Sequence, residues 1–453
     1  MSAPILTTAQ MRAAEQTLFD AGTDPYGLMR RAGEGAAEII WRAGHKRDTL
    51  VLCGPGNNGG DGYVIARALQ ERDVPVRVAA MGEPRTESAA KARADWAGPV
   101  EDIMTAEPAS QIVDALFDIG LTRGLDAALA NRLAELVAEA GHSYALDVPS
   151  GVGSDAALAL SRVPRFTHCI ALGAWKPAHM LQPSRTFAGQ HVLVDIGIEP
   201  PADAVRVLPE PHFQAPEVDA HKYKRGLVAV VAGEMPGAAA LSAEAAARAG
   251  AGYVRLLSEQ ATALSHAIVR SNSREFARAK AVLVGPGLGR DAEAWVRLTE
   301  AMSAGIPMVS DADALWLLAE KDAADLSVPA IMTPHSGEFE HMFGAGDGNK
   351  IERTKAASVK ACSVIVHKGP DTVIAAPDGR CAVAPPASTW LSTAGTGDVL
   401  AGLCAARLAV TGDPFRAACE AVWLHGEAAR RAGPAFIADD LLNHIPAAIG
   451  SRL

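Results

Sequence analysis

The stretch CGPGNNGGDGYVIAR, residues 53–67, places five glycines and two adjacent asparagines between two regular segments. An apolar run of β type, TLVLCG, precedes it, and residues 63–72 carry apolar side chains at the spacing of an amphipathic helix. Glycine loses more backbone freedom on folding than any other residue, so such a cluster indicates positive φ angles or a backbone that another group approaches closely. The flanking segments favour close approach. The predicted order is strand, glycine-rich loop and helix start.

A helix start that follows a glycine-rich loop offers unpaired N–H groups and partial positive charge to a phosphate. A solvated turn without a ligand would also explain the glycines, because such turns are common between strands and helices. Asn57, Asn58 and Asp61 favour a ligand site, since they add amide and carboxylate groups at the mouth of the loop. The spacing fits neither the G-x-G-x-x-G fingerprint nor a Walker loop.

Composition limits the class of protein. The chain has 453 residues, of which 49% are hydrophobic, so two domains are expected. A formal net charge of -10 without a long basic run argues against nucleic-acid or anionic-membrane binding. Six scattered cysteines without a C-x-x-C pair indicate neither a disulfide framework nor a zinc site. With no signal-peptide pattern and no long apolar span, a cytoplasmic protein with small-molecule partners is expected.

The proline-rich stretch at residues 199–222 is the best candidate for a linker, because five of its first eighteen residues are proline. We place one domain at residues 1–207 and the other at 208–453. In both halves, short apolar runs alternate with helical patterns, which is typical of α/β domains with parallel sheets. The first half is predicted to form a Rossmann-like, doubly wound sheet. No repeated motif aligns the halves, so they are read as two different domains.

Polar residues follow several predicted strands of the first half, where open α/β sheets bind ligands. Besides residues 57–61, these segments are DALFDIGLTRG at 114–124 and LDVPSG at 146–151. Each acid alone could equally cap a helix or close a turn. Their shared position predicts a site in which hard oxygen atoms could hold a cation such as potassium or magnesium. Its candidate members are Asp114, Asp118, Asp147 and Ser150.

The second half contains STAGTGDVLAG at residues 392–402, which sets small residues and an acid before an apolar helix. N–H groups of residues 395–397 could hold an anion. Asp398 could accept the proton of an attacking hydroxyl in phosphoryl transfer, although an acid here could also serve only as a helix cap. Three further turns follow predicted strands, at residues 285–289, 333–340 and 367–379. They carry His335 and Glu338 as possible ligand contacts, and Lys368, Gly369 and Thr372 as a nucleotide-phosphate grip.

Together these motifs resemble two known families in tandem. GPGNNGGDGYVIAR, DALFDIGLTRG and LDVPSG resemble the NAD(P)H-hydrate epimerase domain. GPGLG, SDADAL, TPHSGE, KGPDT and TAGTGDVLAG are similar to the ADP/ATP-dependent NAD(P)H-hydrate dehydratase domain, which has a ribokinase-like fold. The match extends over nearly the whole chain in the order of bifunctional bacterial nicotinamide nucleotide repair proteins. It implies two activities, and a homo-oligomer is expected.

The resemblance also implies roles for individual residues. In the first domain, the hydrated cofactor would bind Asn57, Asn58, Gly59, Gly60, Asp61, Asp118, Ile119, Gly120, Leu121, Thr122, Arg123, Gly124 and Asp147. Potassium would bind Asn58, Asp114 and Ser150. In the second domain, the hydrate would bind Ala238, Gly287, His335 and Asp398. The adenine nucleotide, with magnesium, would bind Lys368, Gly369, Pro370, Asp371, Thr372 and Gly397. Catalysis would rest on Asp398 as base and Asp147 as proton-transfer group.

Three positions depart from the family pattern. Asp118 replaces a usual glycine, Ser336 a usual proline and Ser388 a frequent asparagine. Asp118 adds charge to the epimerase pocket, which could impair that activity. One alternative is a ribokinase-like small-molecule kinase, which leaves the first domain unexplained. In another, the first domain is a binding or scaffold module without catalysis.

Overall fold

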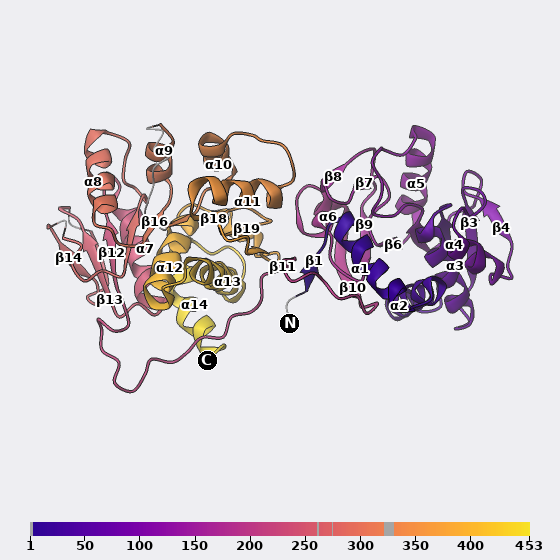
Figure 1. The fold of residues 1–453 in the computed structure, drawn as a ribbon, viewed down its shortest axis with the longest axis horizontal. Helices are drawn as coiled ribbons and strands as arrows, with labels where there is room; N and C mark the ends of the chain where they lie inside the picture. The colour runs from indigo at the N-terminus through magenta and orange to yellow at the C-terminus, as the bar shows by residue number, and fades with distance from the viewer. Residues whose placement is uncertain (1–2, 261, 274, 321–329) are drawn as a thin grey trace. The chain divides into compact units, whose positions relative to one another are not determined.

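The computed structural model describes residues 3–260, 262–273, 275–320 and 330–453. It contains two compact units, Ala3–Ala204 and Val205–Leu453, each an α/β domain built around its own sheet (Figure 1). The α/β fold class predicted from the alternating pattern is confirmed. The chain passes between the units inside the proline-rich stretch, whose residues 205–207 form a strand rather than a linker.

The N-terminal unit is a parallel sheet with helices on both faces. Its strand order is β10-β9-β6-β5-β2-β3-β4. Side chains of β2 alternate between two separate cores, with Val51 in one and Leu52 in the other. The strands are β2 (Thr49–Cys53), β3 (Val76–Ala80), β4 (Val100–Asp102), β5 (Gln111–Ala115), β6 (His142–Leu146), β9 (Phe166–Leu172) and β10 (Ala188–Val194). The helices are α1 (Thr8–Asp20), α2 (Pro25–Gly44), α3 (Asn57–Gln70), α4 (Glu87–Ala94), α5 (Ala127–Glu139) and α6 (Pro177–Met180), with short strands β1 (Pro4–Ile5), β7 (Val152–Gly153) and β8 (Leu158–Ala159) and a 3-10 turn, η1 (Ser184–Phe187).

The direction of chain progression reverses between β2 and β5. From β2 the chain builds β3 and β4 on one side and then returns to place β5 on the other. Ligands of open α/β sheets bind beyond the carboxyl ends of the strands at such a switch point. The start of α3 lies directly after β2, so the glycine-rich stretch occupies this position.

The glycines serve the packing of α3. The helix already begins at Asn57, whereas the sequence pattern predicted a loop there and a helix from residue 63. A side chain at Gly59 would overlap with the carbonyl oxygen of Gly54, and a Cβ at Gly62 would lie 2.9 Å from Cys53 Sγ. Without side chains at these positions, the first turns of α3 can lie against the end of β2. Close approach thus explains Gly59 and Gly62, whereas a Cβ at Gly56 would meet no atom within 4 Å.

The C-terminal unit has a longer, mixed sheet whose order includes β11-β20-β19-β18-β17-β16-β15-β12-β13-β14. It is parallel except where β19 pairs antiparallel with β18 and β20. Its strands are β11 (Val205–Val207), β12 (Leu227–Val231), β13 (Tyr253–Leu257), β14 (Val269–Ser271), β15 (Ala281–Val284), β16 (Met308–Ser310), β17 (Ala330–Met332), β18 (Val364–His367), β19 (Val373–Ala375) and β20 (Cys381–Val383).

Helices cover both faces of this second sheet. Buried residues of α7 (Pro236–Arg248), α12 (Thr396–Thr411), α13 (Pro414–Ala432) and α14 (Ala438–Gly450) form one core. Those of α8 (Ala292–Ser303), α9 (Asp313–Glu320), α10 (Ser336–Phe343) and α11 (Lys350–Ala361) form the other, and a short 3-10 turn, η2 (Thr389–Leu391), precedes α12. Among the described residues, no helix is both long and apolar enough to cross a membrane.

Two candidate active sites

The first site lies at the switch point of the N-terminal sheet. The backbone N–H of Ser150 donates to Asp114 Oδ2 at 2.9 Å, and its hydroxyl donates to Asp114 Oδ1 at 2.7 Å. The same hydroxyl oxygen accepts the N–H of Phe117 at 3.1 Å, and Asn58 Nδ2 donates to the Phe117 carbonyl at 2.8 Å. The three residues predicted to hold potassium are therefore brought together. Burial raises the pKa of Asp114, although hydrogen bonds from Ser150 oppose that effect.

A group of carboxylates surrounds a single buried lysine beside these residues. Lys176 is fully buried, and its ammonium group forms an ion pair with Asp147 and donates to the Leu172 carbonyl at 2.7 Å. Asp147 is held further by the backbone N–H of Leu172 at 3.0 Å and has a left-handed φ of 59°. Burial, together with Asp118, raises the pKa of Glu15 to about 7. Burial and the neighbouring carboxylates also raise the pKa of Asp61 well above its usual range.

The segment 118–124 lies under α1. Thr8 Oγ1 donates to the carbonyl of Ile119 at 3.0 Å, and a Cβ at Gly120 would lie 2.6 Å from Arg12. Asp118 accepts the N–H of Ile119 and lies near enough to Asp147 for the two carboxylates to interact. Partial desolvation and Asp147 raise the pKa of Asp118. The predicted Leu121, Thr122, Arg123 and Gly124 continue this segment, in which Thr122 and Arg123 are exposed.

Sequence reasoning missed Glu15 and Lys176. Lys176 follows β9 directly before a short helix, a strand-end position of the kind that singled out the other candidates. Glu15 is an ordinary helical glutamate in the sequence, and only the crossing of α1 over the strand ends brings it to the site. The other predicted residues of the glycine-rich stretch, Asn57, Gly59 and Gly60, lie in the first turn of α3, where Asn57 accepts a hydrogen bond from Thr86 at 2.6 Å.

The second site is organised around Lys368 in the C-terminal unit. This lysine follows β18, and its Nζ lies 2.7 Å from Asp311 Oδ1 and 3.9 Å from Glu338 Oε2. Asp311, which follows β16, is buried and accepts the hydroxyl of Thr333 at 2.7 Å. Burial opposes the charge of Lys368, but Asp311, Glu338 and Asp398 outweigh it and raise its pKa. Asp311 lies within the motif SDADAL and is a charged member of this site that the sequence pattern did not single out.

Asp398 lies in the first turn of α12. Burial raises its pKa to about 7, an effect that Asp311 increases and Lys368 reduces. Gly395 precedes the helix with a φ of 88°, and among the described residues no side chain caps this helix start. N–H groups of the first turn are therefore available to an anion. A Cβ at Gly397 would lie 3.6 Å from Lys368 Nζ, so the lysine reaches the same helix start.

The turn at residues 285–289 meets the start of α7. The N–H of Met235 donates to the Gly287 carbonyl at 2.9 Å, and a Cβ at Gly287 would lie 3.1 Å from the side chain of Ala238. Ser242 Oγ lies 3.1 Å from the Ala238 carbonyl and 2.9 Å from the Asp398 carbonyl. The predicted Ala238, Gly287 and Asp398 are thereby brought to one place.

The remaining predicted contacts lie around Lys368. His335 caps α10 by accepting the N–H of Gly337 at 3.0 Å, and its side chain is 59% exposed and thus accessible to a ligand. The N–H of Gly369 donates to Thr372 Oγ1 at 3.2 Å. Asp371 is buried and accepts from Lys350 Nζ at 2.6 Å, so its carboxylate stabilises the turn. Gly369 and Pro370 are exposed beside it.

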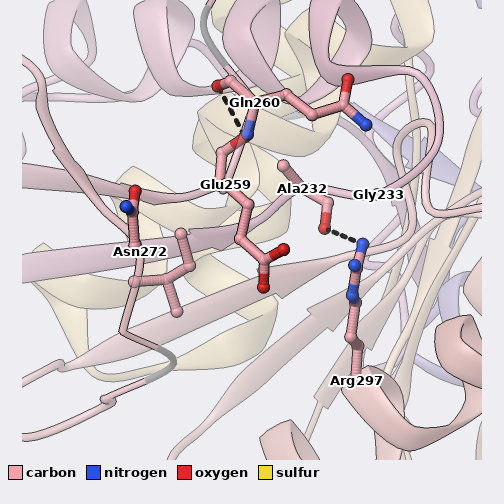
Figure 2. A pocket seen from close by; sticks show the side chains of 8 residues that line it. Ala232, Gly233, Glu259, Gln260, Asn272 and Arg297 are labelled. Atoms are coloured by element: carbon pink, nitrogen blue, oxygen red, sulfur yellow. Dashed lines mark hydrogen bonds between the residues drawn. The ribbon is translucent and has the colours of Figure 1, made fainter.

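Figure 2 shows a polar pocket in the C-terminal unit. It lies beyond β12, β13 and β14, and Glu259 projects between Asn272 and Arg297. Arg297 Nη1 donates to the Ala232 carbonyl at 3.1 Å. A side chain at Gly233 would overlap with Leu288, so this wall of the pocket packs directly on the turn that carries Gly287.

Comparisons with known proteins agree with the motifs. A family described as NAD(P)H-hydrate dehydratase matches residues 228–449, and one described as YjeF-related protein N-terminus matches residues 25–178. The bifunctional NAD(P)H-hydrate repair enzyme of Salinibacter ruber is 33% identical and aligns with 99% of this chain and 96% of its own length. The enzyme of the same description from Escherichia coli is 30% identical over 92% and 88% of the two chains. A Bacillus subtilis ADP/ATP-dependent NAD(P)H-hydrate dehydratase, crystallised with ATP and magnesium, is 28% identical over 53% of this chain and 95% of its own, with a TM-score of 0.47.

Fold and sites define a two-domain α/β enzyme in which each domain gathers charged side chains at the carboxyl ends of its strands. Full-length similarity to the repair enzymes then fixes the family. The chain belongs to the bifunctional NAD(P)H-hydrate repair enzymes, with an epimerase domain followed by a dehydratase domain. The resemblance seen in the sequence motifs is confirmed.

Proposed function

We propose that the C-terminal site dehydrates the S epimer of hydrated NADH or NADPH, with ADP or ATP as phosphoryl donor. The observation that carries this proposal is the placement of Asp398 in an uncapped helix start, within reach of Lys368. Lys368 and the N–H groups of α12 suit the charge of a transferring phosphoryl group. Asp398, with a pKa raised to about 7 by burial, suits a general base near neutral pH.

The reaction follows from these roles. Hydration leaves a hydroxyl at C6 of the nicotinamide ring, and hydroxide is a poor leaving group. Asp398 accepts the proton of this hydroxyl while the oxygen attacks the terminal phosphoryl group of the nucleotide. The bond between this phosphoryl group and the rest of the nucleotide breaks, which releases AMP from ADP or ADP from ATP. The C6–O bond of the resulting phosphate ester then breaks as the lone pair of the ring nitrogen forms a double bond to C6, and phosphate departs. Loss of a proton from C5 restores the reduced cofactor.

Binding partners can be assigned to the described residues. The segment 368–372, in which Gly369 and Pro370 are exposed, would contact the adenine nucleotide, and Ala238, Gly287 and His335 the hydrate. The polar pocket at Glu259 would offer hydrogen bonds to the rest of the dinucleotide. Asp311 and Glu338 supply the oxygen ligands that magnesium prefers, and magnesium would neutralise phosphate charge. Both carboxylates lie close to Lys368, so a magnesium ion bound to them would be near the phosphate groups that the lysine contacts.

We also propose that the N-terminal site interconverts the C6 epimers, with Asp147 as a proton-transfer group. Potassium would be held there by Asn58, Asp114 and Ser150. Their hydrogen-bonded cluster consists of the oxygen-bearing groups that suit a hard cation. A cytoplasmic location and a homo-oligomeric state stay predictions.

A single assay tests the proposal against the alternatives. The protein is incubated with hydrated NADH and either ADP or ATP, and the absorbance of the reduced nicotinamide ring is followed. Recovery of that absorbance only with nucleotide supports the dehydratase. A small-molecule kinase would give no recovery. With a non-catalytic first domain, one epimer would be consumed and the other would follow only at its spontaneous rate.

A further inference from the structure

In the N-terminal site, the carboxyl group of Asp147 has a cationic partner and that of Asp61 has none among the described residues. Asp147 forms an ion pair with the buried Lys176 and accepts a hydrogen bond from the backbone of Leu172, so a negative charge on its carboxylate would be compensated. Asp61 is only 8% exposed, and its carboxyl group has no hydrogen-bond partner or ion pair among the described residues. A buried carboxylate without a partner is costly, so Asp61 is favoured as the neutral acid. Asp118, Asp147 and Glu15 face it and oppose its ionisation further.

Epimerisation of the substrate at C6 requires one acid and one base. At C6 of the hydrate, a carbon atom bears both a hydroxyl and the ring nitrogen, so the lone pair of the nitrogen can expel the hydroxyl once it is protonated. The ring then becomes a cation with a planar C6, which water can attack from either face. An acid must serve the departing hydroxyl and a base the returning water. Two carboxyl groups in different protonation states provide both.

We propose that this site epimerises the hydrate by transient loss and return of water, with Asp61 as the acid and Asp147 as the base. This inference rests on the epimerase activity proposed above. Asp61 donates its proton to the C6 hydroxyl, the C6–O bond breaks, and water and a ring iminium form. Water adds to the other face of C6 and gives a proton to Asp147. Asp61 is then ionised and Asp147 neutral, which is the state needed for the reverse direction.

The excess of acidic groups stabilises the cation. Once Asp61 has given its proton to the hydroxyl, the carboxylates of Asp61, Asp118 and Asp147, with Glu15 partly ionised, are opposed nearby by Lys176 and Arg12. The ring cation therefore forms in a region of surplus negative charge. Electrostatic stabilisation of charge that develops in the transition state is commonly a large part of catalysis. Asp118 therefore supports epimerisation by this route, which reverses the expectation that its charge impairs the pocket.

The source of the C6 oxygen decides between this route and its rival. In the rival route the bond between C6 and the ring nitrogen breaks, the resulting aldehyde rotates, and the ring closes again. A single epimer of hydrated NADH is incubated with the full chain in water labelled with the heavy oxygen isotope. The initial rates of epimerisation and of label uptake are measured by chiral separation and mass spectrometry, and spontaneous rates without protein are subtracted.

We expect one labelled oxygen per epimerisation event. Epimerised product that keeps its original oxygen would overturn the inference and leave the epimerase function standing. Absence of accelerated epimerisation would overturn both. Asp61→Asn should lower the rates of epimerisation and label uptake together by about 10²- to 10⁴-fold, the usual contribution of acid or base catalysis. Because asparagine has nearly the volume of aspartic acid and, like the neutral acid, carries no charge, this variant should remain folded by circular dichroism. Asp20→Asn, at the exposed end of α1, is the matched control and should keep both rates.

Discussion

Asp398→Asn should abolish dehydration while leaving the C-terminal domain folded and able to bind adenine nucleotide. Removal of a general base costs about 10²- to 10⁴-fold in rate. The rate of absorbance recovery from hydrated NADH measures this loss, and calorimetric titration with ADP measures nucleotide affinity. Asp439→Asn is the matched control, because Asp439 is also an acid in the first turn of a helix, yet exposed. Retention of more than about a tenth of the wild-type rate would refute the role of Asp398 as base.

The same substitution should stabilise the domain in a pH-dependent manner. The pKa of Asp398 rises from 3.8 to about 7 on folding, chiefly through burial. At about 1.4 kcal/mol per pKa unit, the ionised carboxylate would cost the folded state at most about 4 kcal/mol, and partial exposure reduces this to about 2 kcal/mol. The cost grows as the pH rises between the two pKa values and is complete above the higher one. Thermal unfolding should therefore show the variant more stable than the wild type at about pH 8, with less than half that gain at about pH 5. An equal gain in stability at both pH values would show that folding does not raise the pKa of the Asp398 carboxyl group.

Four further outcomes are expected. Asp114→Ala should reduce the dependence of epimerisation on potassium concentration, and a potassium response unchanged from wild type would contradict the assigned cation site. Gly59→Ala should lower the free energy of unfolding, measured by denaturant titration, by about 1–3 kcal/mol or more, because the added methyl group meets the Gly54 carbonyl. Gly56→Ala is the control and should change this free energy little, because a Cβ at Gly56 meets no atom within 4 Å. Lys176→Met should lower the free energy of unfolding by about 3–5 kcal/mol, because it leaves Asp147 buried without its cation. If thermal unfolding shows that the variant loses only a few tenths of a kcal/mol, the ion pair contributes no net stability. Cleavage between residues 204 and 205 should yield an N-terminal fragment that epimerises the hydrate without nucleotide. The C-terminal fragment alone should consume a mixture of epimers in a fast and a slow phase. If adding the N-terminal fragment does not remove the slow phase, the assignment of the two activities to separate domains is refuted.

Much of the fold is determined by local sequence patterns. Apolar runs of a few residues that alternate with helical periodicity specify α/β domains, because each pattern can bury its apolar face in only one kind of layer. The runs at TLVLCG and SYALDVPSG form β2 and β6, and Asp126 caps the helix that follows it. Motifs at the ends of such strands also indicated Lys368 and Asp147 as site residues, and the small residues that precede an apolar helix indicated Asp398. Strand-end position is a local property, and the topology of parallel sheets gives it functional meaning.

Tertiary structure decided which charges meet. Glu15 joins the N-terminal site because α1 crosses residues 118–120, and no local pattern encodes that crossing. Asp311 and Lys368, fifty-seven residues apart, pair because β16 and β18 end on the same side of one sheet. The sequence of the glycine-rich stretch predicts a loop, since glycine is a poor helix former, yet packing against β2 overrides that preference and starts the helix at Asn57. Protonation states follow from burial and from neighbours distant in the chain, so the opposite roles assigned to Asp61 and Asp147 required the folded structure.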